Sequence, residues 1–144
     1  MSLDPQRLAL ERELLASLRA DSAGLQQPQV RVQLHALFLE QAEALLQPLL
    51  EDVREWTAGQ AARPSKNTVV RLQRLQGLAQ DRQEPGLIGL SKALHDAVVR
   101  ASVGDTLVSP AACLRAAEEL HRLLHQYAVG VSRMPSDSVL ADLR

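Results

Sequence analysis

The 144-residue chain contains one cysteine, one phenylalanine, one tryptophan and one tyrosine, and neither sign of charge dominates. A single cysteine excludes an intrachain disulfide and fits a reducing compartment. With a net charge of −1, the chain lacks the basic footprint that binding to nucleic acid or to an anionic membrane requires. The shortage of aromatic residues also argues against surfaces on which bases stack.

Long apolar runs are missing as well. No apolar segment approaches the roughly 20 residues needed to span a bilayer. The N-terminus, Met1 to Pro5, does not show the basic and then apolar pattern of a signal peptide. We therefore expect a cytoplasmic protein without membrane insertion.

What the chain does have is an abundance of strong helix formers, chiefly Leu, Ala, Glu, Gln and Arg, with no sustained period-two alternation. Asp4-Pro5 and Ser109-Pro110 each place a capping residue before a proline at the first helical position. Ser65 or Asn67 can cap a further helix. The sequence predicts an all-α protein with helices over about 5–20, 29–58, 67–83, 87–102 and 110–129.

Each predicted helix carries apolar residues at steps of three and four, which defines one buried face per helix. The residues expected inside are Leu8, Leu15, Leu18, Leu34, Phe38, Ala42, Leu45, Leu49, Val53, Trp56, Val69, Leu72, Leu75, Ala79, Leu90, Leu94, Ala97, Val98, Leu114, Ala117, Leu120, Leu124 and Tyr127. Pro48 lies within the second helix and predicts a kink there, because proline removes a backbone donor and crowds the preceding turn.

Short connections between long amphipathic helices favour an antiparallel up-and-down bundle. We expect residues 29–131 to form a four-helix bundle and residues 1–28 to form an additional N-terminal helix and its linker. Residues 132–144 are expected to be a C-terminal tail, in which Val139, Leu140 and Leu143 form a short amphipathic turn.

Three segments resemble a known family in sequence and in register: the block from Phe38 to Leu46, the segment Leu72-Gln73-Arg74-Leu75-Gln76-Gly77, and the turn from Arg100 to Gly104. Together they resemble the histidine phosphotransfer domains of type IV pilus (twitching motility) chemosensory kinases. The resemblance covers roughly residues 34–129 and implies the same four-helix bundle. The usual motif of that family is His-x-x-Lys-Gly. Here Gln73 replaces the histidine and Gln76 the lysine, and Gly77 is kept.

A glutamine side chain has no ring nitrogen that can take a phosphoryl group, and Gln76 supplies no positive charge. Gln73, Gly77 and Gln80 fall on one flank of the predicted third helix, with Gln76 between that flank and the core. We therefore predict a degenerate phosphotransfer-like domain that is not an enzyme, needs no cofactor and docks partners through these four residues. As the resemblance implies, the partner is a response-regulator receiver domain, a chemosensory kinase or a polar-localisation protein.

Two other hypotheses about the function stay open. One is active phosphotransfer through His95, although Val98 and Val99 stand where the family has lysine and glycine, and we expect His95 on the solvent-exposed flank of its helix. The other is an unrelated helical adaptor or chaperone.

Two further groups of reactive side chains have simpler explanations. His121 and His125 are spaced i, i+4, with Glu118 one turn earlier, but without a ligand from elsewhere they favour a solvated polar face over a metal site. His35 belongs to a different predicted helix. Cys113 is expected to be a small core residue and not a nucleophile.

Overall fold

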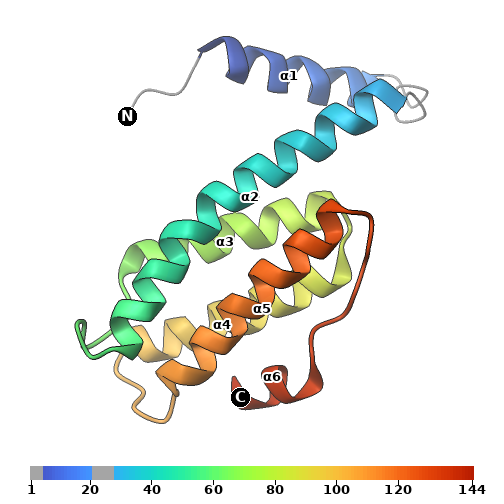
Figure 1. The fold of residues 1–144 in the computed structure, drawn as a ribbon. Coiled ribbons are helices and arrows are strands. Elements are labelled where there is room, and N and C mark those ends of the chain that lie inside the picture. The colour runs from blue at the N-terminus through green and yellow to red at the C-terminus, as the bar shows by residue number, and fades with distance from the viewer. Residues whose placement is uncertain (1–4, 21–27) are drawn as a thin grey trace. The chain divides into compact units, whose positions relative to one another are not determined.

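A computed structural model describes residues 5–20 and 28–144, which are helical without a strand in those ranges (Figure 1). The all-α prediction is confirmed. The helices are α1 (Pro5–Ala20), α2 (Pro28–Thr57), α3 (Lys66–Asp81), α4 (Pro85–Ser102), α5 (Pro110–Ala128) and α6 (Asp137–Asp142). Within the described ranges, none of them combines the length and the apolar character that crossing a bilayer demands.

The chain divides into two compact units, residues 1–41 and 42–144, and the boundary lies inside α2 between Gln41 and Ala42. The boundary predicted from the sequence was at 28/29. The predicted cap Asp4, residues 21–27 of the predicted linker and the side chain of Leu18 lie outside the described residues.

In unit 1 (residues 1–41), α1 and the first part of α2 are joined by polar contacts. Arg7 pairs with Glu40, and the Gln41 amide donates to Glu11 at 2.7 Å. The prediction that Leu15 is buried was wrong, since 42% of it is exposed. Among the described residues of unit 1, α1 has one neighbouring helical segment, the first part of α2, and a single neighbour does not cover a full apolar stripe.

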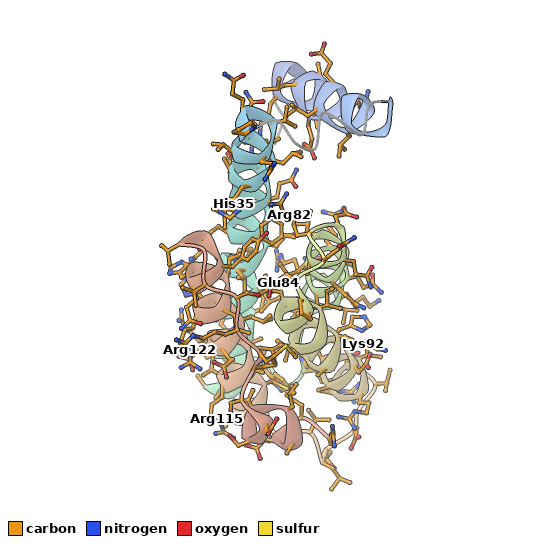
Figure 2. The ribbon with its side chains drawn as sticks, turned by 90° about the vertical axis from the view of Figure 1, so that its right-hand side faces the viewer. His35, Arg82, Glu84, Lys92, Arg115 and Arg122 are labelled. Atoms are coloured by element: carbon orange, nitrogen blue, oxygen red, sulfur yellow. The ribbon has the colours of Figure 1, made fainter. Side chains whose placement is uncertain are left out.

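In unit 2 (residues 42–144), α3 packs against α4 and α4 against α5. The largest fully buried side chains are Leu46, Leu49, Val53, Thr68, Leu72, Leu75, Leu87, Leu90, Leu94, Val98, Leu120 and Leu124. Most were predicted as core. Leu114 was predicted to be buried but is half-exposed, because Cys113, Ala116 and Ala117 fill the centre of that helix face instead. Charged side chains lie on the outer surface of unit 2. Figure 2 shows Arg115 and Arg122 on the outside of α5 and Lys92 on the opposite side of the unit.

Helix starts in unit 2 follow the predicted chemistry. The Ser65 hydroxyl accepts from the Thr68 amide at 3.3 Å, and the Ser109 hydroxyl accepts from the Ala112 amide at 3.2 Å. Such caps satisfy backbone donors that have no partner inside the helix. Pro48 does not interrupt α2, which is continuous from Pro28 to Thr57. The kink near Pro48 stays a prediction.

Thr68 is fully buried although its side chain is polar. Its hydroxyl donates to the Asp52 carboxylate at 3.0 Å, and Arg71 donates to the same carboxylate oxygen at 2.6 Å. A buried hydroxyl without such a partner would cost about 1–3 kcal/mol. Asp52 therefore ties the end of α2 to the start of α3.

Within unit 2, the C-terminal segment (residues 132–144) packs against α4 and α5. It contains α6, and Pro135 and Leu143 are buried. The Ser132 hydroxyl donates to the buried Glu84 carboxylate at 2.6 Å, and the Ser136 amide donates to the buried Glu119 carboxylate at 3.2 Å. The short amphipathic turn predicted from the sequence thus contains a helix, and the residues that lead into this helix donate hydrogen bonds to two buried acids.

Gly86, in the first turn of α4, makes the closest contact with this segment. A Cβ atom at position 86 would lie 2.1 Å from the backbone oxygen of Arg133. Real Cβ atoms do not approach backbone so closely, and neither backbone can yield as a flexible side chain would. The absence of a side chain at position 86 is what lets residues 132–144 lie against α4.

We predict that Gly86→Ala displaces the C-terminal segment and lowers the free energy of unfolding by about 1–3 kcal/mol, the usual cost of overpacking. Urea denaturation followed by circular dichroism measures this. Gly89→Ala is the matched control on the same helix, because a Cβ there has nothing within 4 Å among the described residues. That control should be neutral or slightly stabilising, since alanine is the better helix former. Equal loss in both variants would contradict the close contact at Gly86.

Candidate functional site

The exposed flank of α3 carries the residues predicted to dock a partner. Leu72, Leu75 and Ala79 are buried, which turns the opposite side of the helix outward. Gln73 and Gln80 are exposed, and Gln76 and Gly77 are half-buried. The structure therefore places Gln73, Gly77 and Gln80 on one flank and Gln76 between that flank and the core.

Gly77 leaves a gap in this flank. A Cβ atom at position 77 would have nothing within 4 Å among the described residues. The glycine is therefore not required by packing inside the domain. A partner can approach the α3 backbone closely at this position.

Val70 was not among the predicted site residues, although it belongs to the same flank. It is 41% exposed and lies one turn before Gln73. The sequence could have indicated Val70 as a surface contact, because it is an apolar residue outside the buried face of Leu72, Leu75 and Ala79, where a polar residue would be usual. We call Val70, Gln73, Gln76, Gly77 and Gln80 together the α3 face. It combines amides that donate and accept hydrogen bonds with one apolar side chain and one bare stretch of backbone.

His95 does not lie on the solvent-exposed flank predicted for it. Its side chain is 18% exposed, and its Nε2 atom is buried without a hydrogen-bond partner among the described residues. The Nδ1 atom lies 3.2 Å from the Asp96 carboxylate. The prediction was wrong because the buried face of α4 is wider than expected and includes Ser91, one turn before His95.

His121 and His125 lie beside a carboxylate that sequence spacing did not reveal. The Nε2 atom of His125 is 2.7 Å from Glu43 Oε1, and the Nε2 atom of His121 is 3.5 Å from the same oxygen. Glu43 comes from α2, whereas the predicted neighbour Glu118 is exposed and outside this cluster. We call Glu43, His121 and His125 the His–Glu cluster.

The electrostatics of Glu43 favour its ionised form. Burial raises the pKa of this carboxyl group, but the hydrogen bonds from Gln47 and His125 and the charges of both cluster histidines outweigh burial, so the pKa lies below its ordinary value. The Gln47 amide donates to Glu43 Oε2 at 3.2 Å. This bond leaves Oε1 to the two imidazoles.

Cys113 is a buried core residue, as predicted. Burial raises the pKa of its thiol to about 11, and the nearby charge of Arg100 offsets this only in part. Because the thiolate is the reactive form, Cys113 is not poised for nucleophilic chemistry.

Comparison of the chain with protein-family models, with curated proteins and with solved structures found no match. The function is therefore inferred from the side chains of the α3 face and from the helices that orient it.

We predict that Cys113 in the folded protein reacts with an aromatic disulfide reagent at pH 8 roughly a hundredfold more slowly than in the unfolded chain. The raised pKa keeps the thiolate fraction small below about pH 11, and burial blocks access as well. Absorbance of the released thiolate gives both rates, with guanidinium providing the unfolded reference. Similar rates in the two states would show that Cys113 is accessible.

Proposed function

We propose that the chain is a degenerate phosphotransfer-like signalling module that docks a partner through the α3 face without accepting phosphate. The observation that carries the proposal is the exposed Gln73 one helical turn before the open Gly77. In a phosphotransfer domain, as the sequence resemblance implies, a histidine would project where Gln73 does. The glycine would give a receiver domain close access to it.

The proposal includes an antiparallel up-and-down four-helix bundle built from the second part of α2 with α3, α4 and α5. Contacts between α2 and α5 support this direction. Glu43, early in this part of α2, meets His125 near the end of α5. Thr57, at the end of α2, donates to the carbonyl oxygen of Pro110 at the start of α5, at 3.3 Å.

The connections between neighbouring helices support the same arrangement. The Asp52 contacts with Thr68 and Arg71 join α2 to α3 across the loop that connects them. At the far end of α3, Arg82 donates to the Tyr127 hydroxyl near the end of α5 at 3.1 Å. Such contacts are expected when α3 and α5 run in the same direction and α2 and α4 run in the opposite one.

The mechanism would be scaffolding or competition. A receiver domain would bind the α3 face and be held near, or kept away from, an active phosphotransfer domain of a chemosensory pathway that controls type IV pili. A chemosensory kinase and a polar-localisation protein are the other partners that the resemblance implies. The amide side chains would contribute hydrogen bonds without charge. Val70 would add apolar contact area at the edge of the same surface.

The alternative of phosphotransfer through His95 has a specific obstacle. The Nε2 atom of His95 is buried, so a phosphoryl donor would have to displace the groups that cover it before it could react there. Incubation with a phosphorylated chemosensory kinase and mapping of acid-labile phosphate separate the two hypotheses. Label on His95, His121 or His125 would overturn the docking proposal.

We predict that Gly77→Arg weakens binding of a receiver domain from a type IV pilus chemosensory response regulator at least tenfold. The arginine would fill the gap through which the partner approaches the α3 backbone. The fold should tolerate it, because the position is open and because glycine is less favourable than alanine in a helix by about 0.8–1.0 kcal/mol, whereas arginine ranks close to alanine.

Gly89→Arg is the matched control for that titration, since Gly89 is an equally open helical glycine on α4. Isothermal titration calorimetry compares the parent and both variants, and thermal unfolding verifies their folds. Unchanged affinity of Gly77→Arg, or an equal loss in Gly89→Arg, would refute the α3 face as the docking surface.

We predict that Gln73→His combined with Gln76→Lys creates a phosphate acceptor. The new imidazole supplies the nucleophilic nitrogen, and the lysine supplies positive charge for the phosphoryl group. Labelling by a phosphorylated chemosensory kinase should rise well above that of the parent. Gln80→His, which adds a histidine to the same face at another position, should remain unlabelled. No labelling of the double variant would mean that more than the reactive groups separates this chain from the family.

A further inference from the structure

The His–Glu cluster brings together three side chains from two helices that are far apart in the sequence. His121 and His125 lie one turn apart on α5, and their ring centroids are 4.1 Å from each other. Glu43 reaches them from α2. One donor atom from each side chain lies within 4.8 Å of the other two.

We propose that Glu43, His121 and His125 form a binding site for a divalent transition-metal ion of the zinc type, held between α2 and α5. Zinc binds imidazole nitrogen and carboxylate oxygen at about 2.0–2.2 Å. In a tetrahedral site, this bond length separates neighbouring donor atoms by about 3.3 Å. The Nε2 atoms of His125 and His121 lie 2.7 and 3.5 Å from Glu43 Oε1, on either side of that value, so small side-chain rotations suffice to admit an ion.

The donor set selects the class of ion. Two imidazoles with one carboxylate suit zinc, nickel and copper, whereas magnesium and calcium require sites built mainly from oxygen. The Gln47 amide holds Glu43 Oε2 and thereby directs Oε1 towards the histidines. Orientation of a metal-binding carboxylate by a second hydrogen bond is a common feature of such sites.

Space for a fourth ligand lies next to the cluster. An open hollow of about 500 Å³ is lined by both histidines together with Arg54, Glu118 and other side chains of α2 and α5. Water from this hollow can complete a tetrahedral shell around the ion. Glu118 lines the hollow but is not one of the three clustered donors.

The simpler explanation is an ion pair between a carboxylate and protonated histidines, which the same distances also satisfy. That pair would be partly exposed and would contribute about 0–1 kcal/mol. The two explanations differ in whether the folded protein binds the metal stoichiometrically. The metal inference is independent of the docking proposal, because the α3 face and the His–Glu cluster lie on different helices.

Titration of the full, tag-free chain with zinc chloride at neutral pH, followed by calorimetry, tests the inference. We expect saturable binding of one ion per chain and a rise in the melting temperature, because an ion that binds the folded state stabilises it. Cobalt in place of zinc should give the visible absorption bands of a four-coordinate site.

Glu43→Gln and His125→Ala should each weaken binding at least tenfold. Both side chains are partly exposed, so circular dichroism should show intact helices in both variants. Glu51→Gln is the matched control, because it removes an exposed carboxylate from α2 outside the cluster. Absence of saturable binding, or binding that survives both cluster substitutions, would overturn the site.

Discussion

The burial of Leu72, Leu75 and Ala79 is the constraint on which the proposed function depends. An α-helix turns about 100° per residue, so once these three face the core, the outward direction of the remaining residues is fixed. A shift of the buried face by one residue would carry Gln73 towards the interior. The α3 face is therefore a by-product of core packing, and its chemistry can change without cost to the fold. Under the proposed function, the replacement of an imidazole by an amide on this surface would remove a reaction and leave the buried side of α3 unchanged.

The position of α3 is also fixed by a polar contact, the hydrogen bonds of Asp52 with α3. Asp52 accepts hydrogen bonds from Thr68 and Arg71 and so connects α2 to α3 at their joined ends. Hydrogen bonds to a charged group contribute about 1.5–3 kcal/mol where they are shielded from water, and this carboxylate is only partly shielded. Its greater importance is geometric, because the bonds fix the register of α3 against α2.

Local signals in the sequence predicted the helices, the caps at Ser65 and Ser109, and most of the core of unit 2, since each depends on residues within one or two turns. They also predicted which side of α3 is exposed. The contact of Glu43 with His125 could not be predicted from local signals, because it joins residues 82 positions apart. His95 was misplaced for a related reason: a residue at the margin of a helix face is covered or exposed according to its neighbours in space. The docking of residues 132–144 depends on the missing side chain of Gly86, whose contact with Arg133 joins residues far apart in the sequence.

Glu84 and Glu119 show what that docked segment does for the rest of unit 2. Both carboxylates are buried, and both receive a hydrogen bond from beyond the end of α5, one from Ser132 and one from Ser136. A version of this protein shortened to the end of α5 would leave these acids without those partners. It would also uncover the apolar surface now shielded by Leu143. The buried core of unit 2 therefore extends past the last long helix as far as Leu143.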